Sequence, residues 1–180
     1  MELSTGDRAR RAEELCAAGF WPELLAFAQK WQDETPRDHR AWYYIGLGLG
    51  GMGQPHQAEK AYRRALTLDP TDFEIWNRLS ELLYRDVRRP TDGVRCLKQA
   101  LRIHPDNTTG WLRLANFAGD MGSYNQVLEY ADQAIALNPG LIEAYLQKAQ
   151  AAKALGRLDL LTEACRQLSA FGPENSQPPP

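Results

Sequence analysis

The sequence predicts an all-α fold, an α-solenoid of about five helix-turn-helix units. Two markers recur in phase along the 180 residues. The first is an aromatic series whose members are 34, 35 and 34 positions apart, namely Trp42, Trp76, Trp111 and Tyr145. The second is a proline series with the same spacing, at positions 36, 70, 105, 139 and 173. Self-similarity at one fixed period is typical of stacked helical repeats.

The clearest copy of the repeat is the stretch from residue 41 to residue 70, which has the spacing of two short helices. Apolar residues three, four and seven positions apart place their side chains on one helix face. Small residues such as Gly46 and Ala65 let the two helices approach closely, and Gly53 supplies the turn between them. The second helix ends before Pro70, because the residue that precedes a proline avoids the helical region.

These residues resemble the tetratricopeptide repeat family, whose pattern is Trp-x-x-Leu-Gly-x-x-Tyr, then Ala-x-x-x-Phe, then Pro. The matching positions in the clearest copy are Trp42, Ile45, Gly46, Leu49, Ala58, Tyr62, Ala65 and Pro70. The resemblance implies a right-handed solenoid whose terminal units act as caps. We expect a single array over residues 1–175 and a flexible, proline-rich tail over 176–180. The expected repeats are about 5–38, 39–72, 73–107, 108–141 and 142–175.

The first copy departs from the pattern in its first helix. Arg8 and Arg11 stand where later copies have aromatic or mostly aliphatic residues that would press against a preceding repeat. Because terminal repeats need polar outer faces, we expect both arginines on the outer face of a cap. Trp31 replaces the usual small alanine, so this helix pair should also pack differently from the others.

The second copy carries glycines beyond the repeat pattern, at positions 48, 50 and 51. Each costs about 0.8–1 kcal/mol relative to alanine in a helix interior, so a compensating role is expected. One alternative is that a neighbour such as Tyr84 fills the space, and the other is that the glycines open a recess for a ligand side chain. No Gly-Lys followed by Ser or Thr is present and no strand precedes the stretch, so a phosphate-binding loop is not indicated.

The later copies carry two further departures. The third copy is one residue longer, and its loop from residue 85 to residue 93 carries Arg85, Arg88 and Arg89. Such a cluster is typical of a solvated face, and without interleaved exposed aromatic residues it does not predict nucleic-acid binding. In the fifth copy Lys148 takes an aliphatic position, where its stem can lie on apolar surface while the ammonium reaches water.

The composition argues against several classes of protein. With 43% hydrophobic residues and a net charge of −2, the chain has no general attraction to nucleic acid or anionic membranes. It has no apolar run of the roughly 18 residues that a membrane helix needs, and no secretory signal is visible in residues 1–11. Three widely spaced cysteines fit reduced thiols, so we expect a cytoplasmic protein.

Neither catalysis nor a metal site is predicted. No Ser-His-Asp or Cys-His arrangement can be argued from the sequence, and the acidic residues take ordinary helix-surface and cap positions. The three histidines lie near repeat junctions or turns, without a paired metal-ligand spacing. We therefore expect no enzyme activity, no catalytic residues, no cofactor and no bound metal.

The predicted function is a non-catalytic protein–protein interaction module that holds a peptide or protein segment in a concave groove. Stacked repeats curve and place the first helix of each pair along the concave wall. Arginine can hold a carboxylate through two hydrogen bonds, and asparagine can bridge a backbone amide. The predicted groove residues are Arg40, Tyr43, Tyr44, Leu47, Asn77, Arg78, Glu81, Tyr84, Arg113, Asn116, Gln147 and Gln150.

Several alternatives remain open at this point. Family members that bind chaperone tails use a clamp of Lys, Asn, Asn, Lys and Arg, of which only Arg78, Arg113 and Asn116 match here. The clamp lysines are absent and Gln147 stands in place of the next asparagine, which argues against a chaperone C-terminus as ligand. A self-associating assembly scaffold, a secretion-type chaperone and a regulatory domain of a larger enzyme are the other interpretations. The sequence does not identify the partner.

Overall fold

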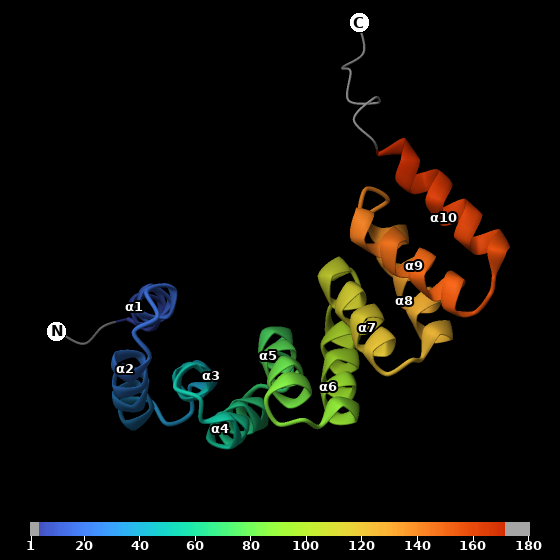
Figure 1. Ribbon diagram of the computed structural model, residues 1–180. Coiled ribbons are helices and arrows are strands. Elements are labelled where there is room, and N and C mark those ends of the chain that lie inside the picture. Colours follow the sequence, from blue (N-terminus) through green and yellow to red (C-terminus); the bar gives the residue numbers. More distant parts are fainter. Residues whose placement is uncertain (1–3, 172–180) are drawn as a thin grey trace, which may run out of the picture. The chain divides into compact units, whose positions relative to one another are not determined.

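The computed structural model describes residues 4–171, which form ten helices and no strand (Figure 1). The predicted tail over 176–180, and the end of the fifth predicted repeat, lie outside the described residues. Successive helices pair as helix-turn-helix units, which confirms the all-α helical repeat fold. The pairs are α1 (Thr5–Ala17) with α2 (Trp21–Glu34), α3 (His39–Gly51) with α4 (Pro55–Leu68), α5 (Phe73–Arg85) with α6 (Pro90–Ile103), α7 (Thr108–Asp120) with α8 (Tyr124–Leu137), and α9 (Ile142–Ala154) with α10 (Leu158–Ala170).

The turns between the two helices of a pair contain the glycines that the sequence predicts there. Gly53 and Gly122 have φ values of 72° and 70°, in the left-handed region that a residue without Cβ enters at no steric cost. The α5–α6 connection lacks such a glycine and is longer, and there Arg88 takes the positive φ of 57° instead. The extra residue of the third copy thus lies in a connection with different turn chemistry, as the sequence predicts.

The chain divides into two compact units, an N-terminal unit that ends at Ile103 and a C-terminal unit that begins at His104. Bulky side chains fill the core of the N-terminal unit, among them Trp31, Ile75 and Leu83, each at most 2% exposed. One core cluster of the C-terminal unit is built around Leu112 and two alanines of α8 and α9. Aromatic and branched residues therefore set the helix spacing in the first unit, and smaller residues contribute more in the second.

Two of the three extra glycines of α3, Gly48 and Gly51, serve helix packing. A Cβ atom added at Gly51 would overlap the indole ring of Trp21 on α2, and one at Gly48 would lie 3.2 Å from Leu25 Cβ. The expected filler, Tyr84, was the wrong neighbour, because the ring comes from the preceding repeat. The recess alternative is also wrong at these two positions, since α2 already occupies the space.

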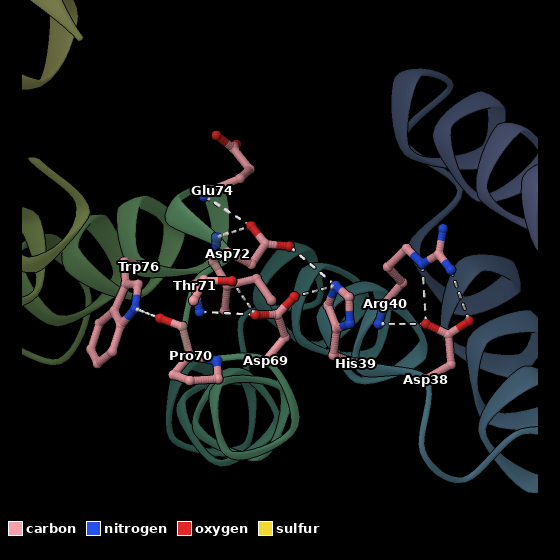
Figure 2. A network of polar contacts seen from close by, with 10 residues as sticks. Asp38, His39, Arg40, Asp69, Pro70, Thr71, Asp72, Glu74 and Trp76 are labelled. Atoms are coloured by element: carbon pink, nitrogen blue, oxygen red, sulfur yellow. Dashed lines mark hydrogen bonds and ion pairs between the residues drawn. The ribbon is translucent and has the colours of Figure 1, made fainter. Parts of the chain in front are cut away.

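A polar network ties the start of α3 to the connection between α4 and α5 (Figure 2). The Nε2 atom of His39 lies 3.3 Å from Asp72 Oδ2 and 3.8 Å from Asp69 Oδ2. Asp72 also caps α5, where its Oδ1 accepts a hydrogen bond from the Glu74 amide at 3.0 Å. The hydroxyl and amide of Thr71 donate to Asp69 Oδ1 at 2.7 and 2.9 Å, and these bonds lower the pKa of Asp69. Successive repeats are thus linked here by polar contacts as well as by packing.

The aromatic marker of the repeat is also a hydrogen-bond donor. Trp76 Nε1 donates to the carbonyl oxygen of Pro70 at 2.9 Å (Figure 2), and Trp111 Nε1 donates to that of Pro105 at 2.8 Å. In both repeats the acceptor is the proline six positions earlier, so the two markers found in the sequence contact each other. Trp42 is the exception, because its Nε1 is buried without a hydrogen-bond partner.

The two arginines of the first copy have different environments. Arg11 is exposed and pairs with Glu14 at 2.9 Å, as expected for an outer face. Arg8 is only 7% exposed, and its Nη2 lies 2.7 Å from Glu34 Oε2 at the end of α2. The predicted outward position of Arg8 is therefore wrong, because the side chain reaches back to a carboxylate of its own repeat. Trp31 stacks on Tyr44 with 5.8 Å between ring centroids, a contact that an alanine could not make.

Charged side chains elsewhere mostly find local partners. The α5–α6 connection is exposed, and Arg89 bonds to Glu59 at 3.0 Å and also to Asp92, which agrees with a solvated face. Lys148 is 18% exposed and its Nζ lies 2.6 Å from Asp132 Oδ1, so a carboxylate receives the ammonium group that was expected to reach water. None of the helices within residues 4–171 is long and apolar enough to cross a membrane.

Candidate functional site

In the N-terminal unit, several predicted groove residues interact with one another. Arg78 Nε donates to Glu74 Oε1 at 2.9 Å, and the guanidinium also interacts with the hydroxyl of Tyr43. Burial raises the pKa of Tyr43, whereas burial alone would lower that of Arg78. The neighbouring Tyr43 and Glu74 outweigh this effect and raise the pKa of Arg78. The centroid of the Tyr43 ring lies 6.2 Å from that of the Tyr62 ring, so a second tyrosine packs against Tyr43.

The other predicted groove residues of this unit are less accessible or are paired. Tyr44 and Asn77 are 6% and 8% exposed, so their side chains support the wall and present little surface to a ligand. The Oδ1 atom of Asn77 is buried without a hydrogen-bond partner. Arg40 is exposed and bonds to Asp38, and Glu81 pairs with Arg85 at 3.3 Å. The remaining two, Leu47 and Tyr84, are half-buried.

In the C-terminal unit, three predicted groove residues meet at one cavity. Its volume is about 390 Å³, within the range of roughly 300–1,000 Å³ that is typical of ligand pockets. It is lined by residues of α7, α8 and α9, namely Asn116, Gly119, Asp120, Tyr124, Val127, Gln147, Gln150, Ala151 and Ala154. The fourth predicted groove residue of this unit, Arg113, is half-buried on α7 and does not line the cavity.

The helix register explains how the cavity forms. On α7, Asn116 and Asp120 are four positions apart and therefore lie on one face, with Gly119 beside them. A Cβ atom added at Gly119 would lie 3.8 Å from Val127 Cγ2 and 3.9 Å from Gln147 Oε1, which is ordinary contact distance. The missing side chain thus leaves space between α7, α8 and α9. Alanines on α9 keep that space open.

The side chains that line the cavity are suited to forming hydrogen bonds with a polar ligand. The carboxamides of Asn116, Gln147 and Gln150 can each donate and accept hydrogen bonds. Asp120 contributes a carboxylate and Tyr124 a phenol that is 38% exposed. No histidine, cysteine, lysine or arginine is among the described residues that line the cavity. Within residues 4–171, no group of three or more metal-ligating side chains could hold a metal ion.

Six of the nine lining residues lie outside the predicted set, namely Gly119, Asp120, Tyr124, Val127, Ala151 and Ala154. Gly119 and Asp120 hold the twelfth and thirteenth places of their repeat, which the repeat register assigns to the inner face, so their places could have revealed them. Tyr124 could not be found in this way, because it begins the second helix of the pair. Nothing in the spacing of the inner helices marks it.

Comparison with known proteins agrees with the repeat pattern. The tetratricopeptide repeat family model matches residues 39–72. The chain is 28% identical over 115 residues to the N-terminal acetyltransferase A complex auxiliary subunit NAA15 of Arabidopsis thaliana, covering 64% of this chain and 11% of that protein. It is 26% identical over 135 residues to the TPR repeat-containing protein YpiA of Bacillus subtilis, covering 75% and 31%. The chain thus spans about a tenth to a third of the length of these relatives.

Solved structures share the fold at low sequence identity. A crystal structure of MamA aligns with a TM-score of 0.77 and 18% identity, over 94% of this chain and 95% of that one. YrrB, described as a TPR protein with an unusual peptide-binding site, aligns with a TM-score of 0.75 and 15% identity, over 93% and 86%. Naa15/Naa10 bound to HypK-THB aligns with a TM-score of 0.74 and 19% identity, over 97% and 26%. At these identities the similarity shows the fold alone.

Proposed function

We propose that this chain, a tetratricopeptide repeat protein, is a non-catalytic module that binds an extended peptide segment of a protein partner. A role in protein–protein interaction follows from the family, and binding of a peptide by the first helices of the repeats is the further step. The observation that carries it is the cavity of the C-terminal unit, where Asn116, Gln147 and Gln150 come together. The described peptide-binding site of YrrB, which has a similar fold, supports the same interpretation.

The carboxamides match the chemistry of an extended peptide. Such a peptide presents an N–H and a C=O group at every residue, with a rise of about 3.3 Å per residue. One carboxamide can accept from the N–H and donate to the C=O of the same residue. Because Asn116 lies on α7 and the two glutamines lie on α9, a peptide in the cavity could be held from two rigid helices.

The non-catalytic part of the proposal rests on the lining, which provides no nucleophile next to a base. A cytoplasmic location stays a prediction. Cys16, Cys96 and Cys165 are free thiols in the structure, which is compatible with a reducing compartment. A chaperone-like adaptor role would need a partner whose folding or delivery depends on the bound segment.

The test is a selection of random dodecapeptides on the immobilised full chain, followed by affinity measurements on the enriched peptides. We expect Asn116→Ala combined with Gln147→Ala to weaken binding roughly tenfold or more, because each loss leaves peptide groups unpaired at about 1–3 kcal/mol. Circular dichroism should show unchanged helicity. If no peptide is enriched, or if enriched peptides bind this variant as well as the wild type, the proposal fails.

The predicted groove arginines provide a second variant. We expect Arg78→Glu combined with Arg113→Glu to abolish capture of a protein partner while helicity stays intact, since the repeat register predicts both side chains on the groove. The matched control is Lys60→Glu combined with Arg64→Glu, which makes the same change of charge at exposed positions on α4. Equal loss of binding in both variants would point to net charge and would contradict a role for the groove.

Self-association is the second candidate function, and exposed apolar side chains favour it. Among residues 4–171, seven of the nine large exposed apolar residues belong to the C-terminal unit, including Leu158 at 72%, Ile142 at 45% and Leu146 at 45%. Exposed apolar residues mark an interaction site where they form a contiguous patch. Light scattering over a range of protein concentrations tests this candidate, because a self-associating scaffold gains mass with concentration and a peptide-binding monomer does not.

A further inference from the structure

One end of the cavity differs in chemistry from the rest. Asp120 is the last residue of α7, and Tyr124 is the first residue of α8, so both lie next to the same turn. Both side chains line the cavity and are exposed to solvent. The carboxamides of Gln147 and Gln150 come from α9 instead. A carboxylate and an aromatic ring therefore border one part of a cavity that otherwise offers uncharged groups.

We propose that this cavity selects peptides that carry a lysine or arginine side chain, which it holds against Asp120 and Tyr124. This inference rests on the proposed function, because it names the kind of peptide that the cavity takes. The peptide main chain would bond to the carboxamides, and its cationic side chain would reach the α7–α8 turn. Asn116, on the same helix face as Asp120, would join the two parts of the site.

Three features of the turn favour a cation. The carboxylate of Asp120 supplies a negative charge in a partly enclosed space. The face of the Tyr124 ring can attract an ammonium or guanidinium group, and a ring at 38% exposure can be reached by a ligand. Cations are also favoured near helix C-termini, and α7 ends at this point.

The charges around the cavity disfavour an acidic peptide. No lysine or arginine belongs to the described lining, so an acidic side chain bound beside Asp120 would meet a second carboxylate there. From residue 104 onward the sequence has eight Asp and Glu against five Lys and Arg, whereas residues 1–103 have fifteen against sixteen. Three of those five cations have carboxylate partners, namely Lys148 with Asp132 at 2.6 Å, Arg166 with Glu163 at 2.7 Å and Arg157 with Asp159 at 3.8 Å. Arg113 also takes part in an interaction within the protein.

Asp120 also takes part in an interaction within the protein, and its side chain is exposed to solvent at the cavity. The two oxygens of a carboxylate accept about four hydrogen bonds in total, so a second donor can be accommodated. A ligand cation would share the carboxylate with that existing interaction. The selectivity should then be moderate and should fall as salt is added.

The experiment compares three synthetic versions of the peptide enriched in the random-dodecapeptide selection. We expect the enriched sequences to share one lysine or arginine position. Replacing that residue by norleucine, which keeps the length without the charge, should weaken binding about fivefold, and replacing it by glutamate should weaken it further. In Asp120→Asn the lysine and norleucine peptides should bind equally well. The matched control Glu129→Gln removes an exposed acid on α8 outside the cavity and should keep the fivefold preference.

A second variant tests whether the peptide occupies the cavity. Gly119→Ala adds a methyl group at ordinary contact distance from Val127 and Gln147, so the helix should become more stable while the space shrinks. We expect a higher thermal midpoint together with weaker binding of the lysine and norleucine peptides alike. Misfolding would lower both the thermal midpoint and the affinity. A higher midpoint together with a lower affinity would therefore show that the peptide occupies the cavity.

The possible failures are distinguishable. If no peptide is enriched, or if binding survives both the Asn116→Ala, Gln147→Ala variant and Gly119→Ala, the proposed function fails and this inference fails with it. If enriched peptides need the cavity but lack a basic position, bind equally well with norleucine, or keep their preference in Asp120→Asn, only the inference about charge is overturned.

Discussion

The N-terminal and C-terminal units use glycine in opposite ways. At Gly46 a Cβ atom would lie 2.5 Å from Tyr62 Cε1, so the missing side chain permits a close aromatic contact. At Gly119 a Cβ atom would meet only Val127 and Gln147 at ordinary distances, so the missing side chain leaves part of a cavity open. A glycine in a helix interior therefore predicts neither packing nor a pocket until the residue opposite it is known.

The polar residues on the first helix of each pair also differ between the two units, in whether neighbouring side chains pair with them or leave space beside them. In the N-terminal unit Arg78 is held by Glu74 and Tyr43, so these side chains satisfy one another. In the C-terminal unit Asn116 and Gln147 border a cavity of about 390 Å³. Aromatic residues close the surface of the first unit, and small residues leave space in the second. We therefore propose the C-terminal unit as the place of the peptide site, and we expect the N-terminal unit to be the more sensitive to changes in its packing.

The largest expected effect is alkaline destabilisation of the N-terminal unit. Burial raises the pKa of Cys96 from 9.0 to about 11, and it also raises the pKa of Tyr43, Tyr44 and Tyr62 above the ordinary 10.0. A raised pKa in the folded state means that the stabilisation is complete below the unfolded-state pKa and is lost as pH rises toward the folded-state value. We expect the thermal midpoint to fall from about pH 9 upward, as circular dichroism can measure.

Fluorescence can assign this loss to one unit, because four of the five tryptophans belong to the N-terminal unit. Above pH 10 the wavelength of maximum emission should shift at a lower temperature than the one at which total helicity is lost. Tyr62→Phe keeps the ring and removes the ionisable hydroxyl, so this variant should lose less stability than the wild type over the same pH range. Wild-type midpoints that stay constant up to pH 11 would refute the effect.

The next largest effect is expected from overpacking in the N-terminal unit. Gly46→Leu would force a branched side chain into the Tyr62 ring and should destabilise the protein by at least about 1–3 kcal/mol. Urea denaturation measures the loss. The matched change in the other unit, Gly119→Ala, meets no clash and should stabilise by up to about 1 kcal/mol. An unchanged midpoint for Gly46→Leu would mean that the assigned helix register is incorrect.

Helix caps provide a smaller contrast. Asp72 Oδ1 accepts from two amides of α5 and its other oxygen contacts His39, whereas Asn107 Oδ1 accepts from the Gly110 amide of α7 at 3.0 Å. Loss of a cap costs about 0.5–2 kcal/mol, so both alanine variants should be destabilised. We expect Asp72→Ala to cost more than Asn107→Ala, because it also removes the contact with His39. Equal losses in urea denaturation would show that the histidine contact adds nothing.

The sequence predicts the helix pairs well because their signals are local. The five expected repeats begin at the first residues of α1, α3, α5, α7 and α9, and Gly53 and Gly122 form the expected turns. Each signal lies within about one helix of the structure that it predicts. Periodicity, turn glycines and prolines act over that range, so the register could be read without any knowledge of tertiary contacts.

The contacts between helices were harder to predict. Trp21 rather than Tyr84 fills the space at Gly51, and Arg8 turns back to Glu34, because in each case a residue of another helix decides the outcome. The cavity combines three predicted residues with Tyr124, whose helix lies outside the inner-helix register. The remaining predicted groove residues stay a prediction. A repeat pattern fixes which face a residue occupies, but whether that face is filled depends on side-chain sizes in neighbouring helices.

The smallest expected difference compares equivalent tryptophans of the two units. Trp111 Nε1 donates to the Pro105 carbonyl at 2.8 Å, whereas Trp42 Nε1 is buried without a partner. Replacing either tryptophan by phenylalanine removes a similar side-chain volume and also removes the indole N–H group. Trp111→Phe loses a hydrogen bond that is worth about 0.5–1.5 kcal/mol, whereas Trp42→Phe also removes a buried unpaired donor and so recovers part of its packing loss. We therefore expect Trp111→Phe to be the more destabilised variant in urea denaturation, and the opposite order would mean that the bond to the proline carbonyl does not stabilise the repeat.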